Sequence, residues 1–254
     1  MQSSTRLALF SSIVLLAPAA GAQVASIVGP QIAPPDCPII TAISNDGPAS
    51  VVTGVCTTAV RDAATGEIVF DPFLCPAIGQ IIPPGGTYIE TWNQLDNSGE
   101  PVPPGDYLVD VVLPSGAMET HPITIGGADA ALAALGVPKI GTTRKYRLCS
   151  PQDAGFPYLL MASGSMGAGL PTCEGTPLFL TPDDVFQLSL STPGTFQNFF
   201  GNLGATGFSS SPQIALPVNP NTVGLELVLA FVVLDLNQAC PIRRVSSPLV
   251  VTIQ

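Results

Sequence analysis

Residues 107–113 read Tyr-Leu-Val-Asp-Val-Val-Leu, and this stretch decides the fold class. Its apolar side chains alternate along the chain, and Asp110 lies among the residues of the opposite face. The alternating apolar set consists of Tyr107, Val109, Val111 and Leu113. Because successive side chains of a strand point to opposite faces, this period of two predicts a β-strand with one buried face.

The same pattern of short strands and turns extends through the rest of the first half. Asp62-Ala-Ala-Thr-Gly66 is a hairpin turn signal, and residues 96–105 are rich in Asn, Gly and Pro, which favour turns. Strands are expected between such turn signals. The ranges expected as strands here are 50–60, 67–70, 87–92 and 106–113.

The second half repeats this organisation. We expect strands at 145–149, 156–162, 185–191, 213–218, 223–236 and 248–253. In the third of these, Phe186, Leu188 and Leu190 alternate with polar residues, whereas 223–236 is apolar on both faces, as expected of a central, covered strand. The sequence therefore predicts an all-β fold of two antiparallel β-sandwich (Ig-like) domains.

A short Ala-rich segment is expected to connect the two domains. Residues 128–136 are dominated by Ala and Leu, with Asp129 placed to cap the start of a helix and Gly136 its end. A helix of this length is unstable alone, so it is expected to pack between the domains or to act as a spacer. The predicted domains are 23–126 and 145–254, and 127–144 is the linker with its short helix.

The N-terminus predicts export. A positive side chain, an apolar run at 7–16 and the small residues Ala20-Gly21-Ala22 form a secretory signal peptide over residues 1–22, with cleavage before Gln23. The longest later apolar run, 223–236, contains two acidic residues. We therefore expect a secreted or extracytoplasmic protein with no membrane insertion after cleavage.

The six cysteines of an exported chain are expected to form disulfides. Cys56 and Cys75 flank the turn at Thr65-Gly66 at nearly equal distances, so antiparallel pairing would bring them opposite each other. Cys173 and Cys240 are a weaker second pair, since both lie in Pro-flanked loops of the same domain. Cys37 and Cys149 remain, one in each domain, without a predicted pairing.

Charge divides unevenly between the halves. Only 10% of the residues are charged and the net charge is −10. Residues 23–138 hold one basic side chain, Arg61, against twelve acidic ones, and residues 139–254 hold six of each. This composition disfavours nucleic acid as a partner. The asymmetry fits either an electrostatically favoured contact between the domains or a solvated acidic surface.

One part of the first half carries a family resemblance. The motif reads Ile82-Pro-Pro-Gly-Gly-Thr87, Thr91-Trp92-Asn93, Asp96-Asn-Ser-Gly99 and Pro101-Val-Pro-Pro-Gly-Asp-Tyr107. It resembles the bacterial Ig-like module of flagellar hook-assembly proteins and, together with 60–69, the intracellular proteinase inhibitor family of bacilli. The resemblance covers about residues 37–125 and implies an Ig-like fold. It departs at Asn93-Gln94, where the family has Asp-Gly, so the first turn is not matched.

The second half, over residues 145–254, resembles an uncharacterised β-rich module that ends many secreted bacterial proteins. This resemblance implies no activity. Pro fixes φ and Gly permits positive φ, so the shared Pro-Pro-Gly patterns are signatures of turns and strand starts. Neither resemblance brings a catalytic or ligand-binding residue to this sequence.

Four candidate sites for chemistry each have a structural interpretation. His121 is the single imidazole, expected in an exposed turn without a neighbouring Cys or second His. Residues 163–167 lack the spacing of a nucleophile elbow, and 96–100 lack the alternating ligands of a calcium loop and favour a hairpin turn. Asp183-Asp184 is expected to cap a turn or begin a strand. The sequence therefore predicts no catalytic, cofactor-binding or metal-ligating residue.

These observations favour an exported, non-enzymatic protein whose Ig-like domains serve binding, adhesion or structural display at or outside the cell surface. Its expected partner is a protein or cell-surface component of unknown identity. The alternative is a protease inhibitor, for which Phe70-Asp-Pro-Phe73 is the best candidate loop. An enzyme of another kind is the least favoured hypothesis.

Overall fold

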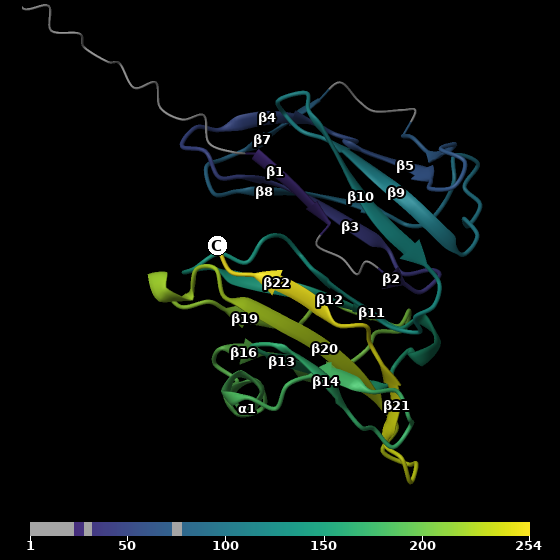
Figure 1. Cartoon of the computed structure of the whole chain (residues 1–254), viewed down its shortest axis with the longest axis vertical. Coiled ribbons are helices and arrows are strands. Elements are labelled where there is room, and N and C mark those ends of the chain that lie inside the picture. The colour runs from purple at the N-terminus through teal and green to yellow at the C-terminus, as the bar shows by residue number, and fades with distance from the viewer. Residues whose placement is uncertain (1–22, 28–31, 73–77) are drawn as a thin grey trace, which may run out of the picture.

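The computed structural model describes residues 23–27, 32–72 and 78–254 and has an all-β fold built from several sheets (Figure 1). The predicted signal peptide, residues 1–22, lies outside the described residues. Each hydrogen-bonded sheet takes all its strands from one side of residue 127. Within the described ranges, no helix has the length and apolarity required to cross a bilayer.

The described residues of the N-terminal half, which runs from 23 to 126, form three sheets. The first has the strand order β1 (Gln23–Ile27), β3 (Ile39–Asn45) and β8 (Thr87–Trp92). The second has the order β2 (Ile32–Ala33), β10 (Met118–Ile125), β9 (Gly105–Val112), β5 (Thr58–Asp62) and β6 (Ile68–Phe70). The third is a two-stranded ribbon of β4 (Val51–Gly54) and β7 (Gly79–Ile82). All pairings are antiparallel except that of β2 with β10.

Strand β9 confirms the period-two prediction. Tyr107, Val109 and Val111 are at most 2% exposed and lie in the core between the sheets. Trp92 on β8 meets Tyr107 edge to face at 6.1 Å between ring centroids. Asp110, on the opposite face, is covered by the Arg61 guanidinium, which donates to its Oδ1 at 2.9 Å.

The C-terminal half, residues 127–254, is also built from three sheets. One has the order β11 (Ala131–Ala134), β12 (Thr143–Cys149), β19 (Gln213–Ala215) and β16 (Phe196–Gln197), with β18 (Phe208–Ser209) also paired to β12. The next has the order β17 (Phe200–Asn202), β13 (Pro157–Ser163), β20 (Glu226–Leu234) and β21 (Ile242–Val245), with β22 (Leu249–Thr252) also on β20. The ribbon is β14 (Met166–Leu170) and β15 (Leu178–Leu180).

Strand β20 is covered on both faces, as its apolar sequence predicts. Its side chains at 227, 229, 231 and 233 belong to the main core of this half, and those at 228, 230 and 232 belong to a second core. The second core also receives Leu178 and Leu180 of β15. The short 3₁₀ helices η1 (Pro151–Asp153) and η2 (Pro220–Thr222) lie in connecting loops.

The predicted Ala-rich helical connector is wrong. Residues 131–134 form strand β11, which pairs with β12, and all four side chains are buried. Leu132 and Ala134 belong to the main core, whereas Ala131 packs against Cys37 and Cys149. A strand covered on both faces needs small side chains where neighbouring layers come close, and here tertiary packing outweighs the helix propensity of Ala.

The predicted strand at 185–191 is also wrong. These residues belong to helix α1 (Asp184–Ser191), whose N-cap Asp183 accepts the Phe186 N–H at 2.9 Å. Val185, Phe186 and Ser189 face the sheets, with the spacing of one helical face. Leu188 and Leu190, the basis of the strand prediction, are each 50% exposed. Helix content is therefore found outside the connector, contrary to expectation.

The single strand expected over 50–60 is divided. Strand β4 pairs with β7, and β5 pairs with β9, so the chain leaves one sheet for another between them. Cys56, in this break, has φ of 68°, in the left-handed region. That backbone conformation interrupts a strand, and here the residue that adopts it is not a Gly.

Strand β3 joins the two halves because it contributes to a core on each of its faces. Ile39 and Ile43 pack into the N-terminal core, whereas Ile40 and Ala42 pack into the main C-terminal core. Figure 1 shows β3 on the side of its half that faces β11, β12 and β22. The main C-terminal core therefore continues across the predicted domain boundary. The division into two sandwich domains stays a prediction.

Candidate functional site at the junction of the halves

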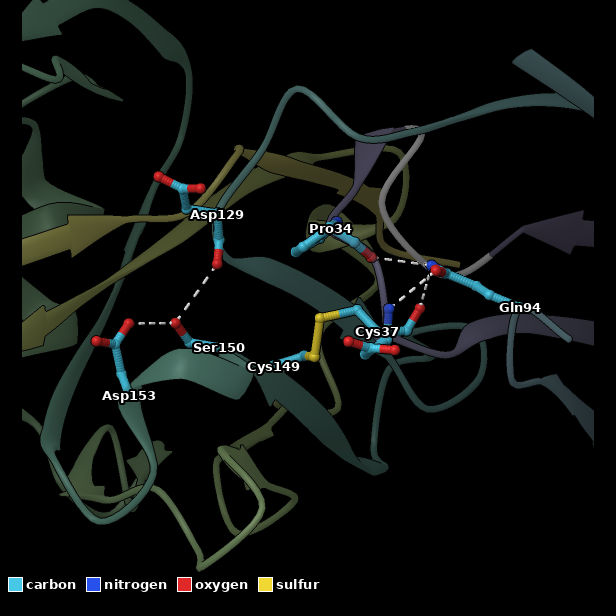
Figure 2. The surroundings of a disulfide bond; sticks show 8 residues. Pro34, Cys37, Gln94, Asp129, Cys149, Ser150 and Asp153 are labelled. Atoms are coloured by element: carbon cyan, nitrogen blue, oxygen red, sulfur yellow. Dashed lines mark hydrogen bonds between the residues drawn. A yellow bond between two sulfur atoms is a disulfide. The ribbon is translucent and has the colours of Figure 1, made fainter. Parts of the chain in front are cut away.

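A disulfide between Cys37 and Cys149 links the halves, and we call it the junction disulfide (Figure 2). Cys37 lies two residues before β3, Cys149 ends β12, and their Cα atoms are 5.9 Å apart. Both side chains are at most 3% exposed and pack with Ala131 and Phe208. The sequence does not predict this pairing, because no local pattern links two residues that are 112 positions apart.

Gln94 holds the loop that carries Cys37. Its Nε2 donates to the carbonyls of Pro34 at 3.0 Å and Cys37 at 2.6 Å, and its Oε1 accepts the Asp36 N–H at 3.1 Å (Figure 2). Gln94 is 3% exposed and has φ of 60°. This is the turn at which the sequence departs from the family motif. Gln94 adopts the left-handed backbone that Gly adopts readily, and its side chain makes three hydrogen bonds.

A buried carboxylate lies on the other side of the junction disulfide. Asp153 is fully buried, accepts the Ser150 hydroxyl at 2.6 Å and pairs with the guanidinium groups of Arg243 and Arg244. Arg244 also donates to Oδ2 of Asp129 at 2.8 Å. A buried carboxylate needs such partners to offset its desolvation. This network therefore anchors η1 to β21 and to the segment that leads into β11.

His121 does not lie in an exposed turn, contrary to expectation. It sits within β10 opposite Val109 of β9, and its Nε2 is 3.8 Å from Oε2 of Glu119. The turn is placed earlier, where Gly116 has φ of 82° and donates to the Leu113 carbonyl at 2.8 Å. The imidazole is thus a side chain of a paired strand.

The fold brings together two other candidates from the sequence, the segment 163–167 and Asp183. The N–H of Gly164 donates to Oδ2 of Asp183 at 2.8 Å, so the turn between β13 and β14 is tied to the cap of α1. Ser163 donates to the Ser165 carbonyl at 2.7 Å, and the Ser165 hydroxyl lies 2.9 Å from that of Thr181. These serines hold a turn, and Asp184 is exposed in the first turn of the helix.

The Asp96 turn agrees with its predicted hairpin role. Its Oδ1 accepts the Ser98 hydroxyl at 2.7 Å, the Ser98 N–H at 2.8 Å and the Glu100 N–H at 3.0 Å. These bonds, led by that of the Ser98 hydroxyl, hold the pKa of Asp96 below its usual range. In the part of the chain that the structure describes, His, Cys, Asp and Glu side chains form no group of three or more suited to a metal ion.

The remaining predicted residues concern disulfides and the candidate inhibitory loop. Cys173 and Cys240, the weaker pair named from the sequence, form a disulfide with Cα atoms 5.5 Å apart. Cys75 lies outside the described residues, so the pairing of Cys56 with Cys75 stays a prediction. Phe73 of the candidate loop also lies outside them, whereas Phe70 packs on Trp92.

Comparisons with known proteins give only distant structural likenesses. No protein family and no curated protein matches the sequence. The solved structures that match include red sea bream transglutaminase, with a TM-score of 0.32, 13% identity, and coverage of 91% of this chain and 31% of that one. Native Escherichia coli α2-macroglobulin gives a TM-score of 0.29, 14% identity, and coverage of 92% and 14%. A tetra-tandem repeat from the extending region of a large adhesion protein gives a TM-score of 0.23 and 12% identity. The match covers 92% of this chain and 48% of that one.

This chain spans less than half the length of each of these three proteins. Likeness at these scores carries no conclusion about function. The expected relation to hook-assembly proteins or to the bacillar inhibitor family is not shown by them.

Proposed function

We propose that this chain is an exported, non-enzymatic protein whose two Ig-like β-sandwich units serve binding, adhesion or structural display at or outside the cell surface. The observation that carries the proposal is the junction disulfide, which fixes one half of the chain on the other. A scaffold that must present surfaces at a fixed spacing benefits from such a link, because domains are otherwise free to move relative to each other.

Other contacts at the junction support a rigid scaffold. Ile40 and Ala42 extend the C-terminal core into the N-terminal half, and Lys139 donates to Asp46 at 2.6 Å. Gln94 fixes the loop next to the junction disulfide. Relative motion of the halves would disturb this apolar packing and the Lys139–Asp46 pair, and the junction disulfide limits its extent.

Export is supported by the disulfides and by the predicted signal peptide. Two disulfides lie wholly within the described residues, and such bonds persist in oxidising compartments. A non-enzymatic role is supported by the use of the candidate groups. Asp183 caps a helix, Ser163 bonds within a turn, and His121 lies in a paired strand.

Fractionation and capture test the proposal. The full chain is produced in a cell able to export it, and the mature N-terminus, its disulfides and its compartment are determined by mass spectrometry. We expect cleavage before Gln23, oxidised cysteines in the exported fraction, and specific capture of a surface or exported partner by the mature protein. A reduced, cytoplasmic chain would contradict the proposal, as would turnover that is lost on changing one Ser, Asp or His.

The alternative, protease inhibition through the loop that begins at Phe70, has one favourable feature. Asp71 is exposed, and its N–H donates to Oδ1 of Asn97 at 2.8 Å, which holds this part of the loop in place. Against it, Phe70 packs on Trp92 and does not protrude. A panel of serine, cysteine and metalloproteases decides the matter, since stoichiometric inhibition would replace the proposal by this alternative.

A further inference from the structure

A small apolar pocket opens at the edge of the N-terminal core, beside strand β8. Its volume is about 240 Å³, and its walls include three aromatic side chains and one carboxylate. We call these residues the aromatic pocket: Phe70, Tyr88, Glu90 and Trp92. The role proposed above makes no use of them.

The strand pattern explains why these side chains meet. Tyr88, Glu90 and Trp92 alternate along β8 and therefore share one face of it. Phe70, at the end of β6, approaches from the facing sheet, with its ring centroid 6.2 Å from that of Trp92 and the planes tilted by 35°. Phe70, Tyr88 and Glu90 are half-buried, so the pocket is both apolar and reachable from solvent.

Glu90 is held in place by neutral donors. Its Oε1 accepts the Thr57 N–H at 2.8 Å and the Tyr88 hydroxyl at 2.9 Å, and its Oε2 accepts the Thr57 N–H and hydroxyl, each at 3.0 Å. Burial, followed by the charge of Glu90, raises the pKa of Tyr88 to about 12, so the phenol remains a neutral donor. None of the ion pairs found among the described residues involves Glu90.

This arrangement favours a cation that has no hydrogen to donate. Aromatic faces attract cations through their negative quadrupole, and a nearby carboxylate adds to that attraction. The carboxylate oxygens of Glu90 already accept from three donors, the shared Thr57 N–H, the Thr57 hydroxyl and the Tyr88 hydroxyl, so most of the roughly four acceptor sites of the carboxylate are occupied. A primary ammonium would give up its hydrogen bonds to water and gain few hydrogen bonds in the pocket. A fully methylated ammonium donates no hydrogen bonds to water, so it gives up little on entering the pocket.

We propose that the aromatic pocket binds a quaternary ammonium group, carried by a small ligand or by an exposed trimethylated side chain. The acidic surroundings support this ligand class, since residues 23–138 carry twelve acidic and one basic side chain, and a field of that sign raises the local concentration of cations. The inference goes beyond the proposed function and does not depend on export or display, because the purified chain suffices to test it.

Trp92 is the single tryptophan of the chain and lines the pocket, so its fluorescence reports binding directly. The full chain is titrated with choline and, separately, with 3,3-dimethylbutan-1-ol, which has the same shape without the charge. We expect saturable quenching by choline, matched by calorimetry, and about tenfold weaker binding of the neutral alcohol, since a cation–π contact of about 1.4 kcal/mol corresponds to that ratio. Equal affinity for both ligands, or no saturable signal in either measurement, would overturn the proposal.

Variants assign the effect to the pocket. Glu90→Gln and Phe70→Leu should each weaken choline binding about tenfold, the first by removing charge and the second by removing an aromatic wall. Glu119→Gln on β10 is the matched control, because it removes the same charge away from the pocket and should leave affinity unchanged. An equal loss in Glu119→Gln would contradict the pocket assignment. If Glu90→Gln fails to fold, Phe70→Leu and the neutral alcohol still decide.

A second set of titrations distinguishes the sources of the group. Choline, a trimethyllysine peptide and phosphatidylcholine vesicles share the same cation but differ in what is attached to it. We expect the pocket to accept the free ligand and the peptide, since its small volume admits a single ammonium group with a narrow stem. Binding of vesicles that persists in Phe70→Leu would show that the lipid surface is recognised elsewhere and would count against the pocket.

Discussion

Replacing Cys37 and Cys149 by Ala tests how strongly the junction disulfide stabilises the chain. The bond closes a loop with a sequence separation of 112, and the chain-entropy relation for a loop of that length gives about 4.8 kcal/mol at 25 °C. Ala is the substitute of choice, because the side chains are buried and Ser would place a hydroxyl in an apolar site.

The Cys173–Cys240 pair provides a matched control within the same chain. Its separation of 67 gives about 4.4 kcal/mol by the same relation, so chain entropy alone predicts two nearly equal losses. Packing predicts a difference, because Cys173 is exposed whereas the junction sulfurs pack on Ala131 and Phe208. We expect the junction variant to lose on the order of 1 kcal/mol more than the control, through the cavity it leaves.

Urea unfolding of the oxidised proteins measures both losses. Trp92 fluorescence follows the N-terminal half, and circular dichroism follows both halves. In the native chain we expect coincident transitions by the two probes, since β3 shares its core with the C-terminal half. A junction variant that is as stable as the native chain, or a control that loses more than the junction variant, would refute the reasoning that the buried bond is the principal link.

Further predictions concern redox behaviour, acid stability and the turn at Gln94. Under native conditions a thiol reductant should open the exposed Cys173–Cys240 bond well before the buried junction disulfide, as alkylation and peptide mass spectrometry will show. The hydrogen-bonded guanidinium of Arg61 lowers the pKa of Asp110 below its unfolded value, so the stabilisation is complete above about pH 5 and is lost as the pH falls through the folded pKa. Asp110→Asn should therefore flatten the acid side of the stability curve in thermal melts, and an unchanged slope would contradict this. Gln94→Gly should lower the free energy of unfolding by about 1–3 kcal/mol, because the loss of buried hydrogen bonds outweighs the relief of backbone strain at positive φ. Denaturant unfolding measures the change, and a gain in stability would contradict this prediction.

The strands that sequence predicts well are those whose pattern reflects one local cause. Strand β9 alternates because one face meets the core, β8 begins and ends at the predicted residues 87 and 92, and β20 is apolar because two cores cover it. In β9 and β20 the apolar side chains of the pattern are the ones that the neighbouring cores bury. Such segments are predictable without knowing which other strands they contact.

Two of the wrong predictions, the connector helix and the strand at 185–191, fail because packing in the folded chain decides the local structure. Ala is a good helix former, but residues 131–134 are a strand because β12 and two layers of side chains surround them. The alternation at 185–191 is helical because Asp183 caps the chain and the helix packs through Val185, Phe186 and Ser189. Asp183, a residue type that caps helices, is visible in the sequence. It is the signal that could have corrected the strand prediction for 185–191.

The junction could not be predicted for a different reason. Cys37 and Cys149 become neighbours only when both halves have folded, and the pairing leaves no mark on the sequence around either residue. Gln94 did leave a sign in the sequence, since it lies at a position where the motif compared above has Gly. A side chain that tolerates positive φ in place of Gly indicates that its hydrogen bonds compensate for the backbone cost.

The structure also bears on the uneven charge of the two halves. Much of the N-terminal acidity is used locally: Asp62 and Asp96 accept backbone N–H groups of their own turns, and Asp110 binds Arg61 on a neighbouring strand. Among the described residues, Lys139 with Asp46 is the ion pair that joins residues 23–126 to the rest of the chain. One such pair contributes at most about 1 kcal/mol, well below the value of the junction disulfide. Apolar packing and a covalent bond therefore hold the halves together, and the acidic field of the N-terminal half remains free to attract cations from solution.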